Sequence, residues 1–150
     1  MRVPLYFAYG SNMDASAMAA RCPRSRLIGR GRLAGYRTIL MASGFVSVAP
    51  DRRMSVHGVL WDVAVGDVAA LDRYEDVARG LYAKKNFAIL REPVGSVHAL
   101  TYVGGRPDLG AAPRGYFDGV IAAARAQALP GDYIDYLSGL PSIHQSGRRP

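Results

Sequence analysis

The order of its elements predicts that this chain has an α+β fold, in which a curved sheet or small β-barrel carries a few flanking helices. Three observations favour this fold. Short strand-like runs fill much of the first two thirds of the chain, glycine and proline separate them, and the longest predicted helix comes late. The 150 residues fit one domain, which we place at residues 1–140, with a loose, basic tail expected at 141–150.

The first elements follow from local signals. Residues 5–9 are apolar and aromatic and are followed by glycine, which predicts a buried strand. Asn12 and Asp14 are good helix N-caps, so a helix is expected over 15–21, ending before Pro23. Strands are then expected at 30–33, 36–41, 45–49 and 56–63, and as a pair at 81–91 and 97–103. Helices are expected at 68–76, 116–129 and 132–137.

Composition narrows the class of protein. The net charge is +7, but the basic residues are spread along the chain without a Lys/Arg block, so we interpret them as a solvated surface and consider nucleic-acid binding unlikely. Cys22 is the only cysteine, so no disulfide forms within the chain. The N-terminus lacks a signal-peptide pattern, and no apolar run reaches membrane-spanning length. We therefore expect a cytoplasmic protein without a membrane partner.

Several kinds of active site find no support in the sequence. The histidines are His57, His98 and His144, and no two of them have the spacing of helical metal ligands, so we expect no metal site. Ser11 is not surrounded by a Gly-x-Ser-x-Gly elbow. Neither the phosphate-binding GxxxxGK[ST] pattern nor GxGxxG is present, so nucleotide binding is not indicated.

A first candidate site is the loop formed by Tyr9, Gly10, Ser11 and Asn12. Glycine between a strand and a helix start allows a tight turn and a close approach of the backbone to a ligand. The amides from Gly10 to Met13 would be unpaired there, and they suit a carboxylate or an oxyanion. The alternative is an ordinary strand-to-helix turn with a polar cap.

A second candidate is Glu75. Helical spacing places Val68, Leu71 and Glu75 on one face, so the carboxylate follows two apolar residues toward the core. Desolvation there would raise its pKa, which is how a carboxylate becomes a proton shuttle near neutral pH. The alternative is a helix-terminal glutamate that reaches solvent or pairs with a nearby cation: Arg73, Arg79 or Lys84.

A third candidate is a set of tyrosines, Tyr82, Tyr102 and Tyr116, which lie on elements expected to face the core. A buried hydroxyl needs a hydrogen-bond partner, so such tyrosines can line a polar pocket. Plain packing is the alternative for each of them.

The chain resembles the γ-glutamylcyclotransferases and their AIG2-like and BtrG-like relatives. The resemblance rests on segments that occur in the family's order: YFAYGSNM at 6–13, HGVLW at 57–61, LDRYEDV at 71–77, GLY at 80–82, ALTYV at 99–103, GY at 115–116 and LPGDY at 129–133. Each segment alone is a weak signal, but the ordered set is fairly specific. Two departures are Asp76, where the family more often has glycine, and His57, where it more often has an aromatic residue.

The resemblance implies a small mixed barrel with a pocket at one end, and neither metal nor cofactor. By position, it makes Glu75 the general acid/base and the loop of residues 9–12 the substrate loop, while Tyr82, Tyr102 and Tyr116 match pocket-lining positions. The implied reaction is release of 5-oxoproline from a γ-glutamyl amine or γ-glutamyl amino acid, a small-molecule partner. Two alternatives stay open: an enzyme that removes a γ-glutamyl protecting group in a biosynthetic pathway, and a non-catalytic, basic binding module.

Overall fold

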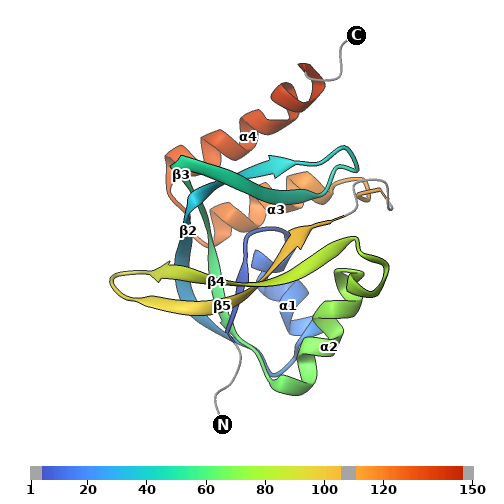
Figure 1. Ribbon diagram of the computed structural model, residues 1–150, viewed down its shortest axis with the longest axis vertical. Helices are drawn as coiled ribbons and strands as arrows, with labels where there is room; N and C mark the ends of the chain where they lie inside the picture. The colour runs from blue at the N-terminus through green and yellow to red at the C-terminus, as the bar shows by residue number, and fades with distance from the viewer. Residues whose placement is uncertain (1–4, 106–110, 147–150) are drawn as a thin grey trace.

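The computed structural model describes residues 5–105 and 111–146, and in it five strands close into a barrel (Figure 1). The strands run in the order β1-β3-β2-β4-β5 around the barrel. Their bounds are β1 Leu5–Ala8, β2 Arg26–Leu40, β3 Val46–Asp62, β4 Tyr82–Arg91 and β5 Ser96–Gly104. β1 pairs with β5 in parallel, and the other pairs are antiparallel. The predicted α+β fold with a small mixed barrel is confirmed.

Two long strands replace four of the short strands that we expected. β2 continues through Gly35, where the register with β3 shifts between Ala34 and Tyr36 and the glycine has a φ of 83°. The glycine therefore marks an irregularity within the strand rather than a strand end. Ala34 pairs with Ser55 and Tyr36 with Pro50, so the extra residues, 51–54, belong to β3. Pro50 likewise lies within β3, opposite Tyr36.

The helical elements are η1 Ser11–Met13, α1 Ala15–Arg21, α2 Val65–Tyr74, η2 Val77–Arg79, α3 Tyr116–Ala126 and α4 Gly131–Ser146. Asp14 caps α1 by accepting a hydrogen bond from the Ser16 amide at 3.0 Å. We expected α3 to be the longest helix, but α4 is longer and runs past Pro141. It thus includes residues 141–146 of the segment expected to be loose, whereas 147–150 lie outside the described residues.

The buried apolar residues form two clusters that share the barrel wall. One cluster consists of residues from the barrel strands together with Tyr9, among them Phe7, Leu60 and Ile89. The other joins strand residues to the helices, with Met18, Leu71 and Leu137 fully buried. Burial of such side chains contributes about 2 kcal/mol each, so the helices are held on the barrel mainly by apolar contact.

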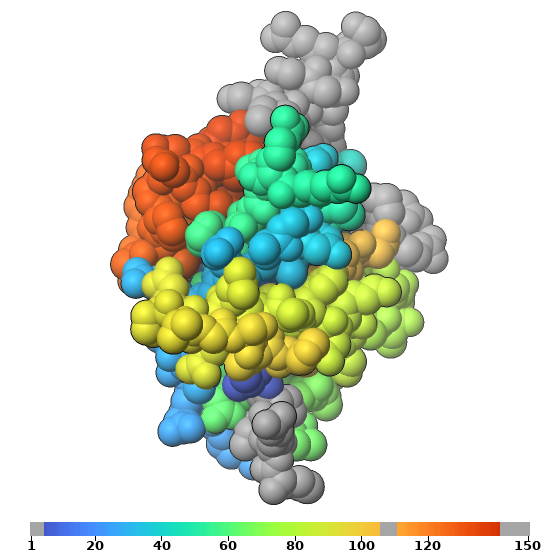
Figure 2. All heavy atoms as spheres, turned by 60° about the vertical axis from the view of Figure 1, so that its left-hand side comes forward, coloured from blue at the N-terminus to red at the C-terminus, as the bar shows by residue number. Residues whose placement is uncertain are grey.

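The helices cover only part of the barrel. In Figure 1, α4 lies at the top of the view and α1 and α2 lie in its lower half, with α3 between them. Figure 2 shows that the β2–β3 and β4–β5 hairpins form another face, with α4 beside them. The short strand β1 passes close against β3, since a Cβ at Gly58 would lie 2.3 Å from the carbonyl oxygen of Ala8. The residues that follow β1, from Tyr9 to Asn12, line a pocket at the end of this strand.

Candidate active site

One pocket at the end of β1 gathers every residue that the sequence named as a candidate. It is lined by Tyr9, Gly10, Ser11, Asn12, Glu75, Tyr82, Tyr102 and Tyr116. The remaining wall is formed by Tyr6, Phe7, Phe45, Val46, Tyr74 and Leu81. Residues from both ends and from the middle of the chain therefore meet around one cavity, which is where the barrel, η1 and the end of α2 come together.

Glu75 lies at the C-terminal end of α2. Leu71, one turn earlier, is fully buried, and Val68 packs against the same core cluster, as the helical spacing predicted. The helix ends one residue before Glu75, which is its C-cap with φ −83° and ψ 1°. The chain then turns sharply at Asp76, which has the left-handed φ of 52°. This turn ends the helix with the glutamate at the pocket wall.

Burial raises the pKa of Glu75 from its usual value near 4.5 to about 7. The positive charge of Arg21 acts in the opposite direction and favours the carboxylate. A carboxyl group with such a pKa is present in both protonation states near neutral pH, and this is the property required of a general acid/base.

Two of the three cations that we considered as ion-pair partners of Glu75 are engaged elsewhere, and Arg73 makes no ion pair with Glu75 within the described residues. Arg79 pairs with Asp76 at 2.9 Å, and Lys84 pairs with Asp72 at 2.9 Å. Within residues 5–105 and 111–146, the Glu75 carboxylate makes no hydrogen bond or ion pair. These contacts therefore do not support the interpretation of Glu75 as a member of a surface salt bridge.

The loop after β1 forms the short helix η1. The Met13 amide donates to the Gly10 carbonyl at 3.1 Å, so this amide is not unpaired as we expected. In the part of the chain that the structure describes, the amides of Gly10, Ser11 and Asn12 have no acceptor. These three N–H groups belong to pocket-lining residues and are available for an anionic or carbonyl oxygen.

At Gly10 the loop packs closely against side chains of the pocket wall. A Cβ at this position would lie 3.1 Å from the Cγ2 atom of Val46 and 3.4 Å from the Tyr116 hydroxyl. A larger residue would therefore occupy space at the pocket wall.

Asn12 has a different role from the helix cap that we expected. Its side chain is buried and donates to the Tyr6 hydroxyl at 3.1 Å, and its Oδ1 atom accepts from Arg21 at 2.5 Å. Its carbonyl oxygen accepts from Trp61 Nε1 at 2.9 Å. These bonds fix the loop to the barrel and to α1, while Asp14 supplies the cap of the helix.

Arg21 and Tyr74 are site residues that the sequence analysis missed. The Arg21 guanidinium lies 3.5 Å above the centre of the Tyr74 ring, a cation–π contact. The Tyr74 hydroxyl shares a 2.6 Å hydrogen bond with Ser11 Oγ. Together these contacts connect the loop to the end of α2, next to Glu75. The only sequence signal was the position of Tyr74 beside Glu75.

Three pocket tyrosines direct their hydroxyl groups to acceptors in the protein. Tyr9 donates to the Tyr102 carbonyl at 2.5 Å, and Tyr82 donates to the Val46 carbonyl at 2.5 Å. Tyr102 donates to Asp72 Oδ1 at 2.6 Å. Burial raises the pKa of each of these tyrosines well above its usual value, so all three stay protonated.

Two further hydroxyls accept hydrogen bonds. Tyr6 accepts from Asn12, and Tyr116 lies 3.5 Å from the amide of Val46, which donates to it. The Tyr116 hydroxyl also interacts with the hydroxyl of Tyr82. Tyr6 was not among the tyrosines that the sequence analysis selected, although it lies in the first quoted segment.

The described residues contain neither a cluster of metal-binding side chains nor a membrane-spanning helix. No group of three or more His, Cys, Asp and Glu side chains in this part of the chain is arranged to hold a metal ion. None of its helices combines the length and apolar character needed to cross a membrane.

Solved structures share this fold. A γ-glutamyl cyclotransferase superposes with a TM-score of 0.80 at 20% identity, over 90% of this chain and 86% of its own. An uncharacterized protein from Homo sapiens gives 0.79 at 23% identity, over 89% and 85%. YkqA from Bacillus subtilis gives 0.77 at 21% identity, over 93% of this chain and 54% of its own.

At these identities the structures establish the fold alone. No curated protein sequence matches the chain. Residues 55–137, more than half of the chain and including Glu75, match the AIG2-like family. The chain therefore belongs to the AIG2-like family.

Proposed function

We propose that this protein is a γ-glutamylcyclotransferase-type enzyme that releases 5-oxoproline from a γ-glutamyl amine or γ-glutamyl amino acid, with Glu75 as its acid/base. The observation that carries the proposal is the Glu75 carboxyl group, with a pKa of about 7, in a pocket that also contains unpaired loop amides. A single group that both accepts and donates protons at neutral pH fits a reaction that needs one base and one acid in turn.

The proposed reaction begins with the Glu75 carboxylate, which takes a proton from the α-ammonium of the substrate. The nitrogen lone pair then attacks the γ-carbonyl carbon, a C–N bond forms, and the carbonyl π electrons move to oxygen. When the carbonyl re-forms, the bond to the leaving amine breaks, and Glu75 gives its proton to that amine. The ring nitrogen still carries two protons after the attack, so the Glu75 carboxylate takes one of them and passes it on to the departing amine. The products are 5-oxoproline and an ammonium ion, and Glu75 is again a carboxylate.

Ring closure joins two ends of one molecule, so positioning supplies much of the rate enhancement. The amides of Gly10, Ser11 and Asn12 are suited to hold the α-carboxylate or to stabilise the oxyanion. The pocket tyrosines and Phe45 would enclose the glutamyl chain and keep water from it.

The test is 5-oxoproline release, measured by mass spectrometry, from a panel of γ-glutamyl dipeptides, γ-glutamyl alkylamines and γ-glutamyl-protected biosynthetic intermediates. The active member identifies the leaving group, and activity confined to the protected intermediates would favour the deprotecting enzyme. If no member yields 5-oxoproline above the rate without enzyme, the proposal is wrong. Salt-dependent retention on a nucleic-acid column would then favour the basic binding module.

A further inference from the structure

The hydrogen bond between Tyr102 and Asp72 fixes the direction of a hydroxyl at the pocket wall. A tyrosine hydroxyl has one proton, and an ionised carboxylate only accepts, so the proton of Tyr102 points to Asp72 at 2.6 Å. Lys84 binds the other carboxylate oxygen at 2.9 Å. Desolvation opposes ionisation of Asp72, but the bonds from Tyr102 and Lys84 outweigh it and keep the pKa of this carboxyl below its usual value.

Tyr9 and Tyr82 are constrained in the same way, because their protons go to main-chain carbonyl oxygens, which cannot donate. We call the hydroxyl oxygens of Tyr9, Tyr82 and Tyr102 the acceptor wall. None of these three oxygens has a proton left for a ligand, so each can only accept, and the Tyr82 oxygen also interacts with the Tyr116 hydroxyl. The loop of residues 10–12 offers N–H donors instead. The pocket therefore has hydrogen-bond acceptors on its tyrosine side and hydrogen-bond donors on its loop side.

We propose that Asp72 is a positioning residue: by holding the proton of Tyr102, it makes the acceptor wall bind the α-amino group of the substrate. The identity of this group rests on the proposed function. An ammonium has only donors, which match the lone pairs of the wall. After Glu75 has taken one proton, the wall still accepts the remaining N–H groups, and the nitrogen lone pair is left to face the γ-carbonyl.

The variant Asp72→Asn reverses this arrangement with little change of shape. Lys84 donates to the new amide oxygen, so the amide nitrogen faces Tyr102 and donates to its oxygen. The Tyr102 proton then turns toward the pocket, where it opposes the donors of an amino group. Binding of an amino group should weaken by about tenfold or more, the usual effect of losing a hydrogen bond to a charged group.

The experiment compares two ligands that differ only in the amino group. L-Glutamine has the α-amine, and 4-carbamoylbutanoate is the same amide without it. Dissociation constants are measured by NMR titration for the wild type and for Asp72→Asn. We expect the wild type to prefer glutamine, and the variant to lose most of that preference while 4-carbamoylbutanoate binds within about threefold of wild type.

Three variants separate positioning from structural damage. Lys84→Met removes the same exposed ion pair but leaves the carboxylate for Tyr102, so it should keep the preference for glutamine. Asp51→Asn makes the same chemical change on β3, between Arg37 and Arg53 and away from the pocket lining, and should also keep it. In a Tyr102→Phe background, Asp72→Asn should have no further effect, because it acts through that hydroxyl.

The outcomes distinguish this inference from the proposed function. The inference is overturned if the wild type does not prefer glutamine, if Asp72→Asn weakens both ligands equally or neither, or if its effect adds fully to that of Tyr102→Phe. Each of these results is compatible with 5-oxoproline release by the wild type. Failure of the whole γ-glutamyl panel to react would instead contradict the proposed function, whatever the binding ratio.

Discussion

Tyrosine hydroxyls gather in two regions of the molecule, and only one of them surrounds a pocket. The first region is the acceptor wall. The second lies between β2 and α4, where Tyr136 donates to the Thr38 carbonyl at 2.7 Å and Tyr133 shares a 2.6 Å hydrogen bond with the Thr38 hydroxyl. The two tyrosine rings stack with their centres 6.3 Å apart. Here the hydroxyls attach α4 to the barrel.

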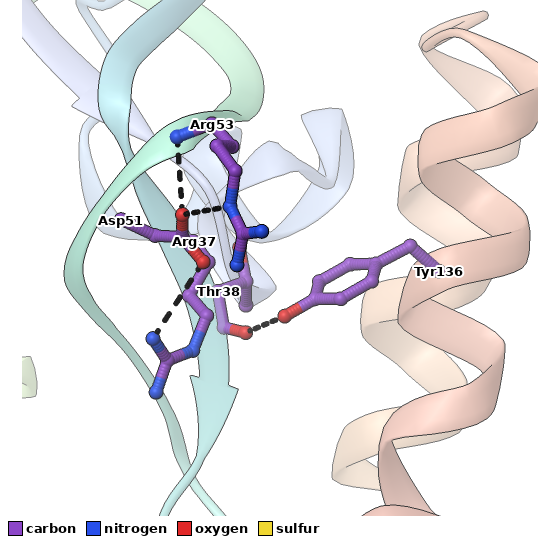
Figure 3. Close-up of polar contacts among 5 residues, drawn as sticks. All are labelled: Arg37, Thr38, Asp51, Arg53 and Tyr136. Atoms are coloured by element: carbon purple, nitrogen blue, oxygen red, sulfur yellow. Dashed lines mark hydrogen bonds and ion pairs between the residues drawn. The ribbon is translucent and has the colours of Figure 1, made fainter.

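The carboxylates near the two regions differ as well. Figure 3 shows Asp51 between Arg37 and Arg53, at 3.8 and 4.0 Å, beside the bond from Tyr136 to Thr38. Glu75, beside the acceptor wall, has no such partner within the described residues, and burial raises its pKa to about 7. Buried tyrosines are thus common to both regions. A carboxyl group available for proton transfer distinguishes the pocket.

The largest effect should come from Glu75→Gln. Glutamine keeps the shape of the side chain but cannot transfer the proton, so we expect kcat to fall by at least about a hundredfold on an active γ-glutamyl substrate. Tyr136→Phe, a comparable deletion in the other region, should leave kcat unchanged. A Gln variant within a few-fold of wild type would show that Glu75 is not the acid/base.

The same variant should change stability in the opposite sense. Because the pKa of Glu75 is raised to about 7, the wild type loses stability as pH rises from about 4.5 to 7 and carries the full cost above that range. Glu75→Gln avoids this cost, so it should be more stable than wild type at pH 8, by about 1–3 kcal/mol, and equal to it near pH 4. Urea unfolding at both pH values measures the difference. Lower stability of the variant at pH 8 would indicate a structural ion pair.

Activity should report the same titration. In the free enzyme, kcat/KM requires the carboxylate, so it should fall about tenfold per pH unit below the pKa of about 7. The substrate amine titrates separately on the alkaline side. Initial rates from pH 5 to 9 measure this profile. If kcat/KM instead falls with an apparent pKa near 4.5, the pKa of Glu75 is not raised in the free enzyme.

The smallest effect should come from Tyr133→Phe. This change leaves the Thr38 hydroxyl, which is fully buried, without its partner, and should cost about 1–2 kcal/mol of unfolding free energy. Activity per folded molecule should stay the same, since Tyr133 does not line the pocket. Thermal melting and steady-state rates separate the two quantities, and a loss of kcat would show that the two regions are coupled.

The turn after β1 and the inward position of Glu75 could be predicted from the sequence because their signals are local. A strand followed by glycine and a helix start predicts the turn, and helical spacing predicts the inward face of α2. The partners of these residues were not predictable in this way. The bonds from Tyr102 to Asp72 and from Tyr9 to the Tyr102 carbonyl join positions 30 and 93 residues apart. Only the closed barrel brings them together.

The turn after Glu75 shows how one departure from the family pattern is accommodated. Asp76 has a left-handed φ of 52°, a conformation in which glycine has no steric cost and aspartate is better tolerated than most residues. Its carboxylate also pairs with Arg79 at 2.9 Å. The sequence showed the substitution, but the backbone angle that explains it depends on the end of the helix.

The way in which the barrel closes has a consequence for its dynamics. β1 joins β5 at the Tyr6–Leu100 pair, whereas β2 and β3 pair from Arg26 to Leu40. The barrel therefore has a short seam, and the pocket spans it, with the loop on the β1 side and Tyr102 on the β5 side. A ligand that contacts both sides would hold β1 and β5 together and would stabilise their pairing. Amide hydrogens of β1 and β5 should then exchange with solvent more slowly when the pocket is filled, while those in the middle of β2 and β3 should hardly change.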